Sequence, residues 1–397
     1  MKMLCILLAA FRFLVSSPGE DAAREAGFNW HCSEPGSVLE LTVATDPSFK
    51  NARTVAPEET FWSLKDHEPS LDVWSEYICR ARVDGLRPDK EYIYRVRLGR
   101  ETSPAGRIRT APRGGSKPWK FVAFIDLQPS FNKNSYPLLS ALDSLVGGEA
   151  VLSVCSGDYT DHGWAQEEWE WALGHPFFRN HPHAGTPGDH EYWGHKKPDG
   201  HIWMMQTPAG YNTMFCNPAN GITECRNSNF WFLWGGVLFA GLDTGDSNTS
   251  VDSTYNAQAQ WLKELAASLK GRYNHFVVFG HKSVYGSDNT DSGVAKNMRP
   301  LWTEAFAEAG VDLFIGGHDH KYSRTGNVGG TWYLDMGSSG SKYRVPEEEM
   351  YSDGIHEKVL DLKATGDCAA AVVTVTEKSL TVEVRSALGE LLDSFSL

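Results

Sequence analysis

Two histidines that stand one residue apart, His318 and His320, follow a short apolar run and are candidate metal ligands. The run, residues 311–315, has the composition of a buried parallel strand, and Gly316 and Gly317 end it. Because side chains alternate along an extended chain, residues i and i+2 point the same way. Neutral imidazole is a common metal ligand, although two histidines in a polar loop would mean little by themselves. The interpretation therefore depends on the other strand ends.

Four other apolar runs lead into a turn that carries Asp or His. The candidate side chains on these turns are Asp126 and Gln128, then Asp158, Asp161 and His162, then Asp189 and His190, and finally His281. A single Gly-Asp turn is common, but its repetition after successive strands is not expected by chance. In open α/β sheets the ligand site lies at the carboxyl ends of the strands. The pattern therefore predicts that these residues converge on one crevice.

The elements that must position these residues alternate between strand and helix. Strands are predicted at 121–125, 150–154, 275–279 and 311–315, and helices at 136–146, 166–173, 257–269 and 299–309. Residues 229–243 have the pattern of a β-hairpin that turns at Gly235 and Gly236. Residues 369–397 return to strands, and we expect them to close a second sheet. Alternating strands and helices predict an α/β layered domain.

The N-terminal part of the chain has a different pattern, with short β-rich runs separated by turns. Strands predicted at 38–44, 77–83, 91–98 and 107–110 are typical of a small all-β sandwich. Residues 86–96 resemble the E–F corner of a fibronectin type III domain. This part contains no cluster of metal-binding side chains, so we interpret it as a scaffold or interaction module. The predicted domains are a fibronectin-III-like sandwich at 30–113 and a ligand-bearing domain at 114–397, with a linker at 111–118.

The five ligand-bearing turns resemble those of the calcineurin-like metallophosphoesterases, and with the β-domain the chain resembles a purple-acid-phosphatase-type enzyme. The resemblance implies a four-layer double β-sandwich of the α/β class, flanked by helices and holding two metal ions. The implied ligands of the first metal are Asp126, Asp158 and His320, with Gln128 or Asp161 in addition. The implied ligands of the second metal are Asp158, Asp189, His281 and His318. Asp158 would bridge both ions, and His190 would lie beside the leaving group.

The sequence departs from the family pattern at two of these positions, and at a third it differs from many non-purple members. Asp161 stands where purple acid phosphatases have a ligating tyrosine, which argues against a ferric, coloured centre. Asp189 stands where the wider superfamily has asparagine, which makes the second site more anionic. Gln128 stands where many non-purple members carry histidine, so the coordination of the first metal stays open. His162 is a second candidate for phosphate contact, with an ordinary surface-loop histidine as the alternative.

Mixed carboxylate and imidazole ligands suit Fe, Zn or Mn rather than calcium. Two such cations ~3.5–4 Å apart can clamp the oxygens of a phosphate ester, generate hydroxide near neutral pH and stabilise the leaving oxygen. His190 can donate a proton to the departing alkoxide. The implied function is a secreted dinuclear-metal phosphatase that hydrolyses phosphate monoesters by attack of a metal-bound hydroxide. A phosphodiesterase or nucleotidase on the same metal core, and a non-catalytic surface binding protein, are the alternatives.

The overall charge of the chain limits its partners. The formal net charge is −13 and there is no basic tract, so nucleic acids and anionic membranes are not expected partners. No apolar stretch is long enough to predict stable insertion into a membrane. The expected partners are small phosphorylated substrates, and the sequence indicates no oligomeric state.

Residues 1–17 resemble a secretory signal peptide. Lys2 precedes an apolar run, and Ser16 and Ser17 are small residues of the kind found near a cleavage site. Arg12 interrupts the apolar run, so a buried N-terminal segment is the alternative. A signal peptide would place the protein in a secreted, extracellular or periplasmic-type compartment.

Three further positions carry predictions about covalent chemistry. Cys216 and Cys225 flank a polar, turn-rich loop and are the disulfide candidates among the seven cysteines. Cys155 lies within an apolar strand pattern and is predicted to be a buried thiol. Asn248 begins an Asn-Thr-Ser glycosylation sequon, a triplet that also arises by chance.

Overall fold

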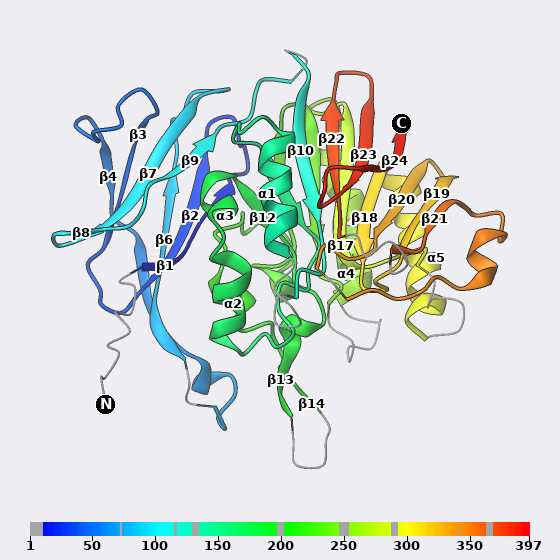
Figure 1. Cartoon of the computed structure of the whole chain (residues 1–397), viewed down its shortest axis with the longest axis horizontal. Helices are drawn as coiled ribbons and strands as arrows, with labels where there is room; N and C mark the ends of the chain where they lie inside the picture. Colours follow the sequence, from blue (N-terminus) through cyan, green and yellow to red (C-terminus); the bar gives the residue numbers. More distant parts are fainter. Residues whose placement is uncertain are drawn as a thin grey trace.

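The structure has two parts, an N-terminal β-sandwich and a larger α/β domain (Figure 1). It is a computed structural model that describes residues 11–71, 74–114, 117–128, 135–196, 202–245, 254–286, 293–340, 342–362 and 368–397. Within those ranges, none of the helices is both long enough and apolar enough to cross a membrane.

The N-terminal part consists of two packed antiparallel sheets. One has the strand order β1-β2-β6-β5, and the other has the order β4-β3-β7-β8 with β9 paired to β7. The strands are β1 (Phe11–Pro18), β2 (Ala26–Cys32), β3 (Val38–Val43), β4 (Arg53–Val55), β5 (Glu58–Ser63), β6 (Ser75–Val83), β7 (Glu91–Leu98), β8 (Glu101–Thr102) and β9 (Gly106–Arg109). Buried side chains from both sheets, Trp30 and Tyr94 among them, form one core. The predicted all-β sandwich is confirmed, while its fibronectin-type label stays a prediction.

The segment for which we predicted a signal peptide contains the first strand of this sandwich. β1 pairs antiparallel with β2, and Ser16 and Ser17 on β1 are buried. Arg12, which interrupts the apolar run in the sequence, forms an ion pair with Glu76 of β6. Cleavage after residue 17 would therefore remove a paired strand and expose the edge of β2.

For residues 11–17 the structure agrees with the alternative, a buried N-terminal segment. Residues 1–10 lie outside the described part of the chain, and a secreted location stays a prediction. The sandwich also begins upstream of residue 30, where the sequence placed its start, because β1 and β2 share a sheet with β5 and β6.

The α/β domain contains two larger sheets that pack face to face. The first has the strand order β12-β11-β10-β22-β23-β24, and the second has the order β15-β16-β17-β18-β20-β19-β21. The strands of the first sheet are β10 (Trp119–Phe124), β11 (Leu152–Cys155), β12 (His183–Gly185), β22 (Ala369–Val375), β23 (Leu380–Ser386) and β24 (Leu391–Ser396). Those of the second are β15 (Phe230–Trp234), β16 (Val237–Leu242), β17 (His275–Lys282), β18 (Leu313–Gly317), β19 (Tyr322–Val328), β20 (Thr331–Met336) and β21 (His356–Leu360). Their inner faces share one core, in which the rings of Phe121 and Phe239 meet with centroids 5.2 Å apart.

Helices cover the outer faces of both sheets. α1 (Ser135–Leu145), α2 (Gln166–Leu173) and α3 (Pro176–Asn180) lie over the first sheet (Figure 1). α4 (Thr254–Ser268) and α5 (Gly293–Ala309) pack on the second. A short hairpin, β13 (Trp193–Lys196) and β14 (Ile202–Met204), projects from the body of the domain (Figure 1). The predicted four-layer α/β architecture is confirmed.

The C-terminal strands differ from the expectation that they would close a second sheet. β22 pairs antiparallel with β10, so residues 369–396 extend the first sheet. The physical reason is that β11 pairs with only one edge of β10, and the other edge needs a partner. The second sheet is built instead from the strands between β15 and β21.

The disulfide predicted between Cys216 and Cys225 is not formed, and both residues are thiols. Cys216 faces the N-terminal sandwich, where a Cβ on Gly27 of β2 would lie 3.0 Å from its Sγ atom. Cys225 ends a short 3-10 helix and accepts hydrogen bonds at its carbonyl from the nitrogens of Ser228 and Asn229. The two cysteines therefore belong to different local packing environments. Cys155 is a buried thiol in β11, as predicted, and Asn248 lies outside the described residues.

Candidate metal centre

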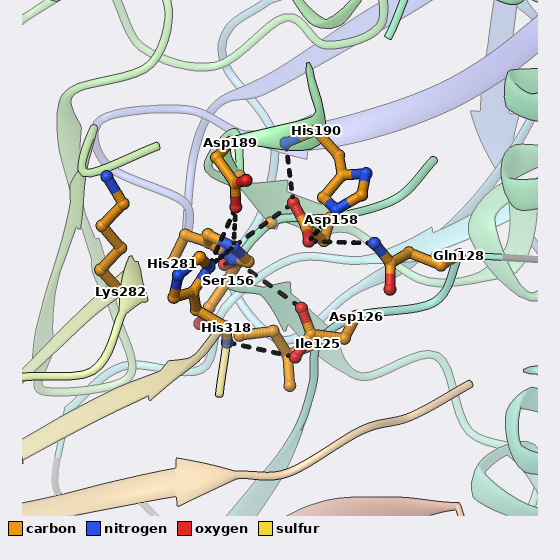
Figure 2. Close-up of polar contacts among 12 residues, drawn as sticks. Ile125, Asp126, Gln128, Ser156, Asp158, Asp189, His190, His281, Lys282 and His318 are labelled. Atoms are coloured by element: carbon orange, nitrogen blue, oxygen red, sulfur yellow. Dashed lines mark hydrogen bonds and ion pairs between the residues drawn. The ribbon is translucent and has the colours of Figure 1, made fainter. Parts of the chain in front are cut away.

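The candidate ligands lie where the parallel strands of the two facing sheets end. Asp126 and Asp158 follow β10 and β11, and Asp189 follows β12, which pairs parallel to β11. In the other sheet, His281 lies near the end of β17, and His318 and His320 follow the parallel strand β18. The structure thus brings these side chains together at the strand ends, as predicted. Figure 2 labels all of them except His320.

Three of the side chains meet around one oxygen atom. Asp189 Oδ1 lies 3.0 Å from Nε2 of His281 and 2.9 Å from Nδ1 of His318. The same two ring nitrogens are 3.2 Å from each other. The set matches the carboxylate and the two imidazoles implied for the second metal.

A second set of donors lies beside the first. Asp126, Asp158 and His320 each offer a ligand atom, and these atoms lie within 4.8 Å of one another. Asp158 connects the two sets, because its Oδ1 atom is 3.3 Å from Nε2 of His281. The arrangement fits two cation positions with Asp158 between them, as the resemblance implied.

The backbone at the ligand-bearing turns adopts conformations that are uncommon for residues other than glycine. Asp126, Asp158, His318 and His320 have φ angles of 50°, 52°, 75° and 56°. Such left-handed conformations are unfavourable for L-residues and concentrate at functional sites. They change the direction of the backbone where it leaves each strand, so that the ligand side chain points into the space between the sheets.

Glycines next to the ligands allow the turns to approach closely. A Cβ atom on Gly188 would lie 2.0 Å from Oδ1 of Asp158, and one on Gly317 would lie 2.9 Å from Oδ2 of Asp126. Both distances are shorter than ordinary contacts, so any side chain here would displace a ligand. This explains why glycine precedes the ligand in these sequence motifs.

Hydrogen bonds to backbone and carboxylate oxygens outside the two donor sets orient the ligands. Nδ1 of His281 lies 3.0 Å from the carbonyl oxygen of Ser156, so it carries the ring hydrogen and leaves Nε2 to face Asp189. Glu191 accepts hydrogen bonds from the backbone nitrogens of Asp158 at 2.9 Å and Gly188 at 2.7 Å. Glu191 therefore links the turn after β11 to the turn after β12, a role that the sequence did not reveal.

Burial dominates the electrostatics of the ligands. It raises the pKa of Asp126 to about 8 and the pKa of Asp158 well above its usual range. It lowers the pKa of His281 to about 4 and that of His320 to about 2. Burial also acts to raise the pKa of Asp189, but the charges and hydrogen bonds of His318 and His281 outweigh it and hold this pKa well below normal.

The donor set fits a bound cation. Asp126 Oδ1 and His320 Nδ1 are buried, and neither atom has a hydrogen-bond partner. Buried polar atoms without partners are costly, and a cation between them would satisfy both. Imidazoles and closely spaced carboxylates are also the ligand types that transition metals bind, and a bound cation would favour the deprotonated form of each.

The remaining predicted residues lie around the two donor sets. Gln128 donates from Nε2 to Oδ2 of Asp158 at 3.1 Å, and its own Oε1 is buried without a hydrogen-bond partner. Asp161 is buried and belongs to neither set, and its role as a ligand stays a prediction. The side chain of His162 is 46% exposed and lies 2.8 Å from Glu168 through Nδ1.

His190 belongs to a third group of possible donors, with Asp158 and Asp189, whose ligand atoms lie within 4.8 Å of one another. Its backbone nitrogen donates to Oδ1 of Asp158 at 3.2 Å, and its ring centroid lies 3.6 Å from that of Trp193, with the two rings tilted by 31°. Its Nε2 atom lies 3.2 Å from the ammonium nitrogen of Lys342. Sequence reasoning missed Lys342, because it follows no strand-end motif of the kind that identified the ligands.

Two known protein families match different parts of the chain. Residues 126–322 match the calcineurin-like phosphoesterase family, and residues 31–112 match the PhoD-like phosphatase N-terminal domain. An uncharacterized protein of Mycobacterium tuberculosis is 24% identical over 334 residues, which cover 77% of this chain and 60% of that protein. A purple acid phosphatase of Glycine max is 23% identical over 65% of this chain and 55% of its own length. The chain thus spans about 60% of the length of the curated relatives it matches.

Solved structures share the fold across nearly the whole chain. A purple acid phosphatase from yellow lupin (Lupinus luteus) superposes with a TM-score of 0.76 at 17% identity, covering 98% of this chain and 74% of its own. A PhoD structure superposes with a TM-score of 0.66 at 14% identity, covering 97% and 90%. Residues 126–322 therefore belong to the calcineurin-like phosphoesterase family, and in this chain they follow a PhoD-like N-terminal domain.

Proposed function

We propose that the protein is a dinuclear-metal phosphatase that hydrolyses phosphate monoesters. The observation that carries the proposal is the pair of adjacent donor sets that Asp158 connects, because it belongs to the first set and its Oδ1 lies 3.3 Å from His281 of the second. Asp126 and His320 would complete the first metal site, and Asp189, His281 and His318 the second. The mixture of carboxylates and imidazoles favours Fe, Zn or Mn over calcium.

The two metals, when bound, would neutralise the phosphate and supply the nucleophile near neutral pH. The residues of this chain would hold and orient them. Asp158 presents its carboxylate to both positions, and Glu191 fixes its backbone through the hydrogen bond to the Asp158 nitrogen. The Ser156 carbonyl sets the ring orientation of His281. His190 would contact the substrate on the leaving-group side, because its ring lies beside Asp158 and is anchored through Nδ1 to the Asp161 carbonyl at 2.8 Å.

Metal stoichiometry measured together with hydrolysis would test the proposal. We expect the full chain, reconstituted with Mn²⁺, Zn²⁺ or Fe, to bind two metal equivalents and to hydrolyse p-nitrophenyl phosphate faster than bis(p-nitrophenyl) phosphate. His281→Ala should lose one equivalent and most of the activity. Binding of a single metal that His281→Ala does not alter would contradict the dinuclear site, and faster hydrolysis of the diester would favour a phosphodiesterase. Bound metal without hydrolysis of either ester would favour a binding protein.

A further inference from the structure

Lys342 brings a positive charge to the site from a loop that carries none of the ligands. Its Nζ atom lies 3.2 Å from Nε2 of His190. The other ring nitrogen of His190, Nδ1, lies 2.8 Å from the carbonyl oxygen of Asp161, and a carbonyl can only accept a hydrogen bond. Nδ1 therefore carries the ring hydrogen, and Nε2 accepts the hydrogen bond that Lys342 donates.

The loop is attached to the turns that carry the ligands of the first metal set. Before Lys342, the backbone nitrogen of Gly340 donates to the carbonyl of Asp126 at 3.0 Å. After it, the nitrogen of Arg344 donates to the carbonyl of His320 at 3.0 Å. A Cβ on Gly340 would lie 2.3 Å from the carbonyl oxygen of Leu127, so glycine alone allows this approach. Lys342 is thus tethered on both sides to the ligand-bearing turns.

The charge of Lys342 reaches the space between the carboxylates. The ring nitrogen that Lys342 contacts, Nε2 of His190, lies 3.8 Å from Oδ2 of Asp158. Lys342 is half-buried, so its side chain is accessible from solvent. An anion that entered between the metals and His190 would therefore come within reach of this ammonium group.

The charges of the ligands, the metals and the substrate explain what an ammonium group at this position could do. Three carboxylates, on Asp126, Asp158 and Asp189, would offset most of the positive charge of two divalent cations. A phosphate monoester brings two further negative charges near neutral pH, and a diester brings one. An additional cation at the edge of the site favours the more highly charged group.

We propose that Lys342 binds the non-bridging oxygens of the substrate phosphoryl group and so selects phosphoryl groups that carry two negative charges. The inference rests on the proposed function, because it assigns a substrate contact within the same site. An ammonium group on a flexible stem can leave Nε2 of His190 and point at a phosphate oxygen. A charge-assisted hydrogen bond of this kind would stabilise a dianion more than a monoanion.

The test compares Lys342→Met with wild type in the full chain loaded with Mn²⁺. Inorganic phosphate is the probe, and its affinity is measured by calorimetry without any turnover. We expect Lys342→Met to bind phosphate about 10- to 100-fold more weakly, the range for losing one charge-assisted contact. KM for p-nitrophenyl phosphate should rise by a similar factor, while hydrolysis of bis(p-nitrophenyl) phosphate should change by less than about threefold. Metal content, by elemental analysis, should equal that of wild type.

Two control variants sharpen the comparison. Lys263→Met removes the same charge from α4, where Lys263 pairs with Glu308 at 3.2 Å, and should bind phosphate as wild type does. Lys342→Arg keeps the charge and should stay within about threefold of wild type. Equal losses in Lys342→Arg and Lys342→Met would overturn the proposal, because charge would then not be the property that matters. A loss of metal in Lys342→Met would also overturn it, because the residue would then serve the metals.

The outcome for Lys342 can be separated from the outcome for the proposed function. If wild type hydrolyses the monoester and Lys342→Met binds phosphate normally, the inference fails and the proposed function stands. If wild type binds phosphate in a Lys342-dependent manner but hydrolyses no ester, the proposed function fails and the inference stands.

Discussion

Asp158 lies at the centre of the site because contacts from both sides meet at its carboxylate. Oδ1 accepts a hydrogen bond from the His190 backbone at 3.2 Å and lies 3.3 Å from Nε2 of His281. Oδ2 accepts from Gln128 at 3.1 Å. Each oxygen is therefore held toward a different part of the site (Figure 2). A carboxylate fixed in this way is suited to bridging two cations rather than chelating one.

Asp189 makes the clearest prediction at the scale of a single residue. Asp189→Asn keeps the shape of the side chain but removes the charge that faces His281 and His318. We expect retention of the second metal against a chelator to weaken by about tenfold or more, because direct attraction to the cation is lost. Metal release is followed by elemental analysis after timed dialysis. Asp84→Asn, at an exposed position of the N-terminal domain, is the control. Equal release from the two variants would exclude Asp189 as a ligand.

At the scale of elements, the sequence predicted the strands and helices well because their patterns are local. α2 and β7 have the predicted bounds, and the hairpin of β15 and β16 turns at Gly235 and Gly236 as expected. The ligands could be predicted for the same reason, since each directly follows a strand. Pairing between strands that are far apart in the sequence could not be predicted. β22 pairs with β10, whereas we expected the C-terminal strands to close a second sheet. Lys342 was missed because a loop far along the chain places it, through backbone hydrogen bonds that no motif encodes.

The turn between β12 and Asp189 gives a prediction about backbone approach. Gly188→Ala would place a Cβ 2.0 Å from Oδ1 of Asp158, so the two turns would have to separate. We expect metal content to fall below one equivalent per chain. Gly148→Ala serves as the control, because its Cβ would meet open space, although its φ of 68° costs about 1 kcal/mol in stability. Normal metal content in Gly188→Ala would show that the turns can move apart without losing the site.

His183 on β12 gives a prediction about pH. Its ring is fully buried, with Nδ1 2.8 Å from Ser153 Oγ and Nε2 2.6 Å from Tyr159 Oη, and burial lowers its pKa to about 3. The unfolded chain binds this proton near pH 6.5, so stability is lost as the pH falls from about 6.5 toward about 3. The loss attributable to His183 is about 2 kcal/mol at about pH 5.

The contribution of His183 to the free energy of unfolding is measured by urea unfolding of the metal-free protein near neutral pH and at about pH 5. His183→Gln should be less stable than wild type near neutral pH, but its loss of stability on acidification should be smaller by about 2 kcal/mol. Other groups titrate in both proteins, so the difference between the two losses isolates His183. An identical pH dependence in the two proteins would mean that the imidazole becomes protonated without unfolding.

At the scale of the whole molecule, the N-terminal sandwich holds residues 212–217 in place. This segment lies against the end of β12, the strand that precedes Asp189. Backbone carbonyls of residues 212–217 accept hydrogen bonds from the sandwich, including those from His31 at 2.8 Å and Arg82 at 2.7 Å. Within the same segment, Tyr211 donates through Oη to the carbonyl of Gly185 at 2.5 Å, at the end of β12. The sandwich is thus connected, through one segment, to the strand that precedes Asp189.

Arg80 tests this connection. It lies on β6, is partly buried, and donates to Asn29 Oδ1 at 3.3 Å and to the carbonyl of Asn212 across the domain boundary. Arg80→Met should reduce the free energy of unfolding by about 0.5–1.5 kcal/mol, because the partly buried carbonyl of Asn212 loses its donor. It should also accelerate release of the metal held by Asp189 while leaving the other metal in place. Arg53→Met removes an exposed arginine whose partner, Asp84, lies within the same domain, and should change neither quantity. If both variants behave alike, the sandwich contributes nothing to the site beyond being attached to it.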